Sequence, residues 1–359
     1  MSKWPDRRIL DLFGIALPII QAPMAGVSPP ALAIAVAEAG GLGSLPCTLL
    51  APDQMRAAFA TIRAATAKPI NANFFCYTPT ADPAREAAWR ARFAPNYAAL
   101  GLDPGLRPSA PAIPPFGAVH CDLIEELKPE IVSFHCGLPE ETFIDRIKAC
   151  GSKIISSATT VMEASWLEER GCDAIIAQGS ESGGHRAMFL SGDVSMQVGL
   201  MALLPQIADA VEVPVIGAGG IADGRGIAAA FALGAAAVQI GTAYLFSPEA
   251  DVAPLYRQAL AETEPDQTVI SNVFTGHPAR IIANRTVRAV GPMAADAPPF
   301  PLAGSTLAPL RQAAESRGSV DYTPLWSGQA AGLGRALPAG VLTKDLAEAA
   351  LARLRQLQG

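Results

Sequence analysis

The chain has 359 residues, of which 50% are hydrophobic and 17% are charged, and its formal net charge at pH 7 is −6. This length is enough to bury a large core in one α/β domain or in two smaller ones. The negative charge and the lack of lysine and arginine runs argue against a nucleic-acid partner. No apolar stretch suits a signal peptide or a membrane span, so we expect a soluble, cytoplasmic protein without a membrane partner.

Short apolar runs alternate with amphipathic segments through the first two thirds of the chain. The runs predict eight buried strands, and the Ala-rich segments between most of them have helical periodicity. This alternation predicts an α/β protein with a closed (β/α)8 TIM barrel. A doubly wound open sheet is the alternative, but the residues after the first run, 23–27, lack the glycine-rich fingerprint of that fold. The predicted strands are 19–22, 41–45, 70–75, 131–134, 153–157, 173–177, 215–217 and 237–240, and the predicted helices are 30–39, 52–66, 140–149, 161–170, 197–211, 225–233 and 253–261.

Two regions of the chain are additional to the strands and helices of a minimal barrel. Residues 77–116, rich in proline and alanine, form an insertion between strands three and four, and we expect it to fold over the face that carries the active site. Residues 262–359 contain many prolines and two further helical segments. We therefore divide the chain into a barrel domain, 1–261, and a C-terminal extension, 262–359, that packs on the barrel or caps it.

The six cysteines are spread along the chain without a Cys-x-x-Cys pair. In a large chain without a secretion signal, we expect them to be reduced thiols. No two histidines or cysteines have the spacing of zinc ligands, so we also expect no metal site.

The most informative segment follows the sixth predicted strand and reads Gln-Gly-Ser-Glu-Ser-Gly-Gly-His-Arg over residues 178–186. The adjacent glycines lack a Cβ, so the main chain can turn tightly and approach a ligand. Histidine is the side chain that best accepts a proton near neutral pH, which makes His185 a candidate general base. The alternative is a surface loop with an incidental histidine.

Two glycine-rich turns follow the seventh and eighth predicted strands. Gly219 and Gly220 lie in the first turn, where Asp223 is the expected N-cap of the next helix, and Gly241 and Thr242 lie in the second. In a barrel, the loops after these two strands commonly hold a phosphate through backbone N–H groups. The pair of turns therefore predicts a phosphate site, whereas the alternative is that the glycines serve only to pack helices on strands.

Other strand ends carry amides and a thioether. Asn73 and Gln178 can hydrogen-bond the edge of a pyrimidine-like ring, and Met24 offers apolar contact. Phosphoryl transfer is disfavoured, because no Walker lysine or magnesium-binding carboxylate pair accompanies the turns. Flavin mononucleotide (FMN) meets this set of demands. For single residues the alternatives stay open, with Met24 as a core residue and Asn73 as a residue that fixes its own loop.

The motifs together resemble the nitronate monooxygenase family, formerly called 2-nitropropane dioxygenases, in a class I-like form. They are Gln-Ala-Pro-Met-Ala-Gly at 21–26, Asn-Ala-Asn-Phe-Phe at 71–75, Ser-Phe-His at 133–135, the segment at 178–186, Ala-Gly-Gly-Ile-Ala-Asp-Gly at 218–224, Gln-Ile-Gly-Thr at 239–242 and Phe-Thr-Gly-His-Pro-Ala-Arg at 274–280. The resemblance implies a TIM barrel that binds FMN, with His185 as the catalytic base and His135 as a second catalytic candidate. The FMN contacts that it implies are Ala22, Pro23, Met24, Asn73, Gln178, Gly183, Gly184, Gly219, Gly220, Gln239, Gly241 and Thr242.

By this resemblance the enzyme oxidises alkyl nitronates or nitroalkanes with dioxygen to a carbonyl compound and nitrite, and a homodimer is possible. The sequence departs from the family pattern at Ser182, where alanine is usual, at Ala187, where glycine is usual, and at Tyr77, where histidine is frequent. These positions lie near the expected substrate space, so they bear on the substrate more than on the flavin.

Two other functions stay open. The segments at 181–185 and 276–280 also resemble FMN-dependent enoyl-acyl-carrier-protein reductases, which share the barrel and use NADH. The motif at 133–135 and the insertion at 77–116 favour the monooxygenase branch. A non-catalytic FMN-binding sensor or scaffold is the third possibility, against which the intact His185 argues. For His135 the alternatives are contact with the nitro group and a core histidine bonded to backbone, while His120 and His277 are expected to be structural.

Overall fold

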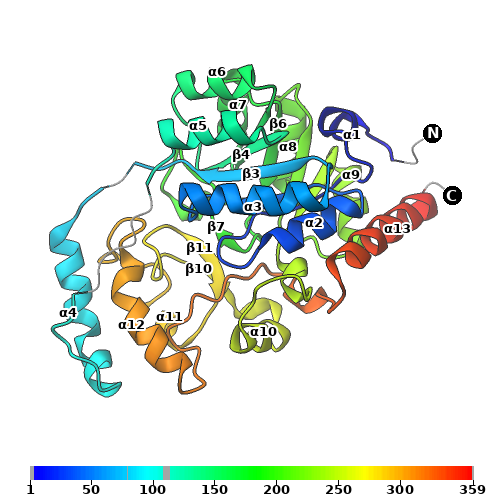
Figure 1. Cartoon of the computed structure of the whole chain (residues 1–359). Coiled ribbons are helices and arrows are strands. Elements are labelled where there is room, and N and C mark those ends of the chain that lie inside the picture. Colours follow the sequence, from blue (N-terminus) through cyan, green and yellow to red (C-terminus); the bar gives the residue numbers. More distant parts are fainter. Residues whose placement is uncertain (1–3, 79, 108–113, 358–359) are drawn as a thin grey trace.

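The computed structural model describes residues 4–78, 80–107 and 114–357 (Figure 1). Eight parallel strands form one sheet in the order β1-β9-β8-β6-β5-β4-β3-β2. The Gln21 amide donates to the Leu42 carbonyl and the Leu42 amide to the Ile19 carbonyl, both at 2.9 Å, which joins the two ends of the sheet. The predicted α/β TIM barrel is thereby confirmed. Its strands are β1 (Ile19–Gln21), β2 (Gly43–Pro46), β3 (Ile70–Phe75), β4 (Ile131–His135), β5 (Lys153–Ala158), β6 (Ala174–Gln178), β8 (Val215–Ala218) and β9 (Ala237–Ile240).

Helices surround the barrel and bury its outer face. The chain turns from several of these helices into the next strand at a glycine with positive φ, a backbone conformation that side chains with a Cβ rarely adopt. Gly151 and Gly234, with φ of 87° and 99°, make such turns. The surrounding helices are α2 (Pro30–Glu38), α3 (Pro52–Ala65), α5 (Ala118–Leu127), α6 (Glu141–Ala149), α7 (Val161–Glu169), α8 (Leu200–Ala210), α9 (Gly224–Ala232) and α13 (Ala339–Leu357).

The last helix of the chain completes the ring. α13 packs against α9 and α2, so that it lies beside the first and the last of the barrel helices that precede it (Figure 1). Its residues Leu342, Leu346 and Ala350 belong to the main hydrophobic core. The predicted helix at 253–261 exists as α10 (Pro254–Ala261), but it packs on the short turn η4 (Ala331–Leu333) rather than in the ring.

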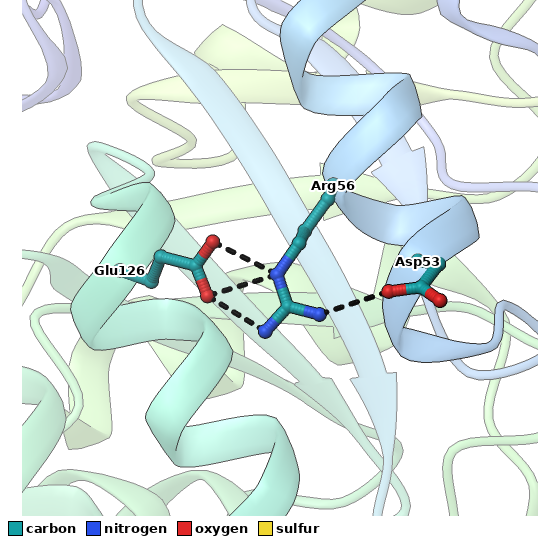
Figure 2. A network of polar contacts seen from close by, with 3 residues as sticks. All are labelled: Asp53, Arg56 and Glu126. Carbon is teal, nitrogen blue, oxygen red and sulfur yellow. Dashed lines mark hydrogen bonds and ion pairs between the residues drawn. The ribbon is translucent and has the colours of Figure 1, made fainter.

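An ion-pair network links two neighbouring outer helices. Arg56 on α3 donates from Nε and Nη2 to the Glu126 carboxylate on α5 at 2.8 Å, and from Nη1 to Asp53 at 3.1 Å (Figure 2). All three side chains are exposed, and exposed ion pairs add little to stability. The network therefore aligns α5 with α3 rather than holding the barrel together.

A second, smaller core lies beside the barrel. It is formed by the three-stranded sheet β10-β11-β7, by two helices of the C-terminal extension and by α4 of the insertion, and we call this unit the cap. The Trp89 indole of α4 donates to the Ala303 carbonyl at 3.2 Å, and the Tyr97 hydroxyl donates to the Thr306 carbonyl at 2.7 Å. The cap elements are α4 (Pro83–Ala99), β7 (Gly184–His185), β10 (Thr268–Ser271), β11 (Ala279–Ile282), α11 (Arg285–Val290) and α12 (Ala303–Glu315). The remaining elements are α1 (Arg8–Phe13) and the short turns η1 (Val194–Met196), η2 (Thr242–Phe246) and η3 (Pro265–Gln267).

The insertion thus joins the C-terminal extension. α4 lies along the outer side of α12 (Figure 1). The domain boundary at residue 261 stays a prediction, because residues 262–359 divide their contacts between the cap and the barrel ring. Within the described ranges, none of the helices is both long and apolar enough to cross a bilayer.

We predict that the contact between α9 and α13 tolerates no extra atom. A Cβ added at Gly224 would lie 2.5 Å from the Ala349 carbonyl carbon, so Gly224→Ala should push the helices apart and lower the free energy of unfolding by about 1–3 kcal/mol. Gly226 is the matched control in the same helix, because its added Cβ meets ordinary contacts of 3.4 Å or more. Gly226→Ala should be neutral or stabilise by up to about 1 kcal/mol. Urea unfolding measures both variants, and equal effects would contradict the packing described.

Candidate functional site

A cavity of about 770 Å³ opens at the carboxyl ends of the barrel strands. Its volume is in the range of cofactor and substrate sites. All the catalytic and FMN-contact candidates from the sequence line this cavity, although they come from six different strand ends. They are Ala22, Pro23, Met24, Asn73, His135, Gln178, Gly183, Gly184, His185, Gly219, Gly220, Gln239, Gly241 and Thr242.

The cap forms the opposite wall of the cavity. Phe300, Leu307 and Trp326 contribute apolar surface, and Arg311 contributes a positive charge. The sequence led us to expect that the insertion 77–116 lies over this face. In the described part of the insertion no residue lines the main cavity, and Tyr77 instead borders a neighbouring cavity of about 190 Å³. The C-terminal extension covers the cavity instead, because α4 packs against the outer side of α12.

The two glycine-rich turns lie side by side on the barrel wall. Gly219 and Gly220 have φ values of 114° and 68°, so both adopt the left-handed conformation that favours glycine. The following Asp223 accepts hydrogen bonds from the Arg225 and Gly226 amides, at 2.9 and 3.2 Å, and caps α9 as predicted. Successive backbone N–H groups in such turns make concavities that bind anions.

Two polar side chains in the same wall have unused hydrogen-bonding capacity. The Gln239 Oε1 atom is buried, and among the described residues nothing donates a hydrogen bond to it. The Thr242 Oγ1 atom accepts from the Gly328 amide at 2.9 Å, which leaves its hydroxyl proton to donate elsewhere. A buried acceptor without a donor costs free energy, and because Gln239 lines the cavity, a donor on a bound molecule could satisfy its carbonyl oxygen.

His185 stands between the barrel and the cap. It lies on β7, which pairs with β11 so that His185 faces Ala279. Its Nε2 atom is 3.0 Å from the Thr275 hydroxyl, and the rings of Phe75, Phe300 and Trp326 lie within 5.5 Å of its own. Burial, followed by the neighbouring His277 and His135, holds the pKa of His185 well below its usual value. The imidazole is therefore neutral at pH 7 and able to accept a proton.

The two neighbouring histidines form hydrogen bonds to backbone carbonyls. His135 Nε2 donates to the His185 carbonyl at 3.0 Å, and His277 Nε2 donates to the Arg186 carbonyl at 2.7 Å. A carbonyl oxygen only accepts, so the proton of each ring must be on Nε2. Burial lowers the pKa of His135 to about 4, and it also lowers the pKa of His277. Of the two alternatives for His135, this geometry fits the histidine bonded to backbone, although the ring also borders the cavity.

The loop that carries His185 is fixed by its own side chains. Gln178 donates from Nε2 to the His185 carbonyl at 3.0 Å and accepts from the Ala187 amide at 2.9 Å. The buried Arg186 donates to the carbonyls of Gly179 and Gln178, at 2.8 and 2.9 Å. Both ends of the Gln178 amide are thus used within the loop. Its first structural role is to place His185.

Sequence reasoning did not identify several residues of this site. Thr275 lies in the motif at 274–280, but its position beside His185 depends on the pairing of β11 with β7, which the sequence does not reveal. Gly328, Phe300 and Trp326 come from a part of the chain without strand periodicity. In the described ranges, no three histidine, cysteine, aspartate or glutamate side chains are grouped as metal ligands.

Comparison with known proteins gives consistent matches over the whole chain. The nitronate monooxygenase family profile matches residues 6–349. A nitronate monooxygenase of Pseudomonas aeruginosa is 41% identical, with 95% of this chain and 98% of that protein covered, and one of Paraburkholderia phytofirmans is 42% identical, with 98% and 97% covered. A crystal structure of nitroalkane oxidase from Streptomyces ansochromogenes has a TM-score of 0.87 at 35% identity, with 98% of this chain and 100% of that chain covered.

The neutral histidines predict a pH dependence of stability. The pKa of His135 is about 4 in the folded chain and about 6.5 when exposed, so the unfolded chain binds more protons in this window. The contribution of His135 to the free energy of unfolding should therefore be complete above about pH 6.5 and be lost as the pH falls towards 4. His135→Gln keeps an N–H donor without a titrating ring, and should lose about 2 kcal/mol less than the wild type between pH 7 and 5. Urea unfolding at the two pH values measures this difference, and parallel losses would contradict the burial of a neutral His135.

Proposed function

The chain belongs to the nitronate monooxygenase family, and from this premise we propose that it oxidises alkyl nitronates and nitroalkanes with dioxygen, by means of bound FMN, to a carbonyl compound and nitrite. The observation that carries the proposal is the position of His185. A neutral imidazole borders a cavity whose other wall has the glycine turns and amides that suit a flavin. A cytoplasmic location and a homodimer stay predictions.

The residues present fit FMN. The phosphate would be held by backbone N–H groups of Gly219, Gly220 and Gly241 and by the Thr242 hydroxyl, since the carboxyl ends of neighbouring barrel strands are a common phosphate site. The unpartnered Gln239 Oε1 atom supports a flavin ring next to the phosphate, because a ring N–H of the flavin would supply the missing donor. When bound, FMN supplies the oxidation and reduction chemistry.

The remaining contacts of the flavin come from three places. Ala22, Pro23 and Met24 offer apolar surface after β1, and Gly183 and Gly184 allow close approach of the β6–β7 loop. Asn73 is tied to the Ser133 hydroxyl through its Nδ2 atom at 2.9 Å, which leaves its Oδ1 atom to face a ligand. Gln178 would act mainly through the His185 loop.

The protein's own part in the reaction is to hold the substrate and to move one proton. His185 would accept the α-proton when the substrate arrives as a neutral nitroalkane, whereas a pre-formed nitronate has already lost this proton and needs no base. The rings of Phe75, Phe300 and Trp326 would exclude water around this step. His135 would keep the His185 backbone in place, because its Nε2 atom donates to the His185 carbonyl.

We predict that His185→Asn separates the two substrate forms. Without a base, kcat/KM for the neutral nitroalkane should fall about 100-fold or more, the usual size of a general-base contribution. The loss with pre-formed nitronate should be less than about tenfold, because no proton has to be removed. Steady-state oxygen consumption with both forms makes the comparison. Equal losses would remove the base assignment.

We also predict that Gly241→Ala weakens FMN binding without harming the fold. Gly241 has a negative φ, and its added Cβ would meet Ala22 and Met24 at 3.4 and 3.7 Å, on the cavity wall. Gly217→Ala is the matched control, because its Cβ would meet the helix side chains Leu204 and Ala230 at 3.4 and 3.5 Å, away from the cavity. The FMN dissociation constant, followed by flavin fluorescence, should rise about tenfold or more for the first variant only. An unchanged constant would argue against FMN at this wall.

A further inference from the structure

The cap places a hydroxyl group opposite His185. Thr275 lies in the loop that joins β10 to β11, and β11 pairs with β7, the strand of His185. The loop is closely fixed, because the Gly276 amide donates to the Asn272 carbonyl at 2.7 Å and a Cβ at Gly276 would overlap the Pro298 carbonyl. Thr275 therefore approaches His185 from a rigid segment and not from a loop that is free to turn.

The hydrogen bonds around Thr275 have one consistent arrangement. Its hydroxyl lies 3.2 Å from the His277 carbonyl, 3.4 Å from the His277 amide and 3.0 Å from His185 Nε2. The carbonyl can only accept, so the single hydroxyl proton goes to it. The hydroxyl oxygen then accepts from the His277 amide and from an N–H at His185 Nε2. All the groups are satisfied when His185 carries its proton on Nε2.

The opposite tautomer would leave a polar group without a partner. If Nε2 carried the lone pair, the Thr275 proton would have to turn towards it and leave the His277 carbonyl. The other ring nitrogen, Nδ1, is not among the buried atoms that lack a partner in the described ranges, which fits a position open to the cavity. The titratable groups that act on the ring are His135 on β4 and His277 in the β10–β11 loop, and the charged Arg311 of α12 lines the same cavity. The guanidinium of Arg186, the next residue in the chain, is hydrogen-bonded to the Gly179 and Gln178 carbonyls.

We propose that Thr275 is a positioning residue, whose hydroxyl fixes the Nε2–H tautomer of His185 and leaves Nδ1 as the atom that takes the substrate proton. This inference deepens the proposed function and rests on it for the reaction alone. In the step, the α-carbon–hydrogen bond of the nitroalkane breaks, its electron pair stays on the substrate as the nitronate, and the proton moves to Nδ1. The Nε2–H bond to Thr275 is kept throughout, so that the imidazolium meets an acceptor already in place.

The tautomer can be read without any substrate. The chain has only four histidines, so protein labelled with ¹⁵N-histidine gives few ring signals, and His185→Asn identifies those of His185. In the purified wild-type protein at pH 7 we expect a protonated Nε2 and an unprotonated Nδ1. Thr275→Ser keeps the hydroxyl and should show the same protonation of the two ring nitrogens. The isosteric Thr275→Val lacks the hydroxyl and should no longer show it. A protonated Nδ1 in the wild type, or an unchanged pattern in Thr275→Val, would overturn the proposal.

Kinetics test the consequence for proton transfer. In Thr275→Val, kcat/KM for a neutral nitroalkane should fall about 10- to 100-fold, and its acid limb should move to lower pH because the imidazolium has lost an acceptor. The value for pre-formed nitronate should change less than about threefold, and Thr275→Ser should recover most of the loss. If both substrate forms fell together, or if serine did not recover the loss, Thr275 would be merely structural. A wild type that oxidises neither form would refute the proposed function, while the ring signals would still decide the tautomer.

Discussion

The site depends on the pairing of two residues, Gly184 and His185, with the cap strand β11. Because β6 is part of the barrel and β11 is part of the cap, this pairing fixes the position of the base relative to both units. It also brings Thr275 and His277 to the base from a segment about 90 residues further along the chain. The side chains of Gln178 and Arg186 then hold the loop from the barrel side. Without this pairing, the histidine would lie on a loop supported from one side only.

The cavity that results has two walls of different chemistry. The barrel wall offers glycine turns, amides and a buried carbonyl oxygen without a donor, which suits a phosphorylated ring. The cap wall is mainly aromatic and aliphatic, includes Arg311, and suits a small organic substrate. His185 lies on β7, which pairs with the cap strand β11, and it borders the same cavity as both walls. Burial keeps its imidazole neutral at pH 7.

The sequence predicted the barrel well, because apolar runs and helical periodicity are local signals. All eight strands lie within one or two residues of their predicted ranges, and the glycine turns after β8 and β9 border the cavity as expected. The cap was not predictable in the same way. Its core depends on the contact of Trp89 with residues more than 200 positions away, and the place of α13 beside α2 depends on the closure of the whole ring. Thr275 was missed for the same reason, since a hydroxyl becomes meaningful only when strand pairing brings it to the base.

The most direct test is anaerobic mixing of the purified protein with ethyl nitronate and, separately, with NADH, while the visible absorbance of the flavin is followed. The account predicts a yellow protein whose flavin is bleached by the nitronate and not by NADH. Bleaching by NADH alone would move the protein to a reductase function and leave His185 without its assigned role. A colourless protein that takes up no added FMN would contradict the cofactor assignment at the barrel wall.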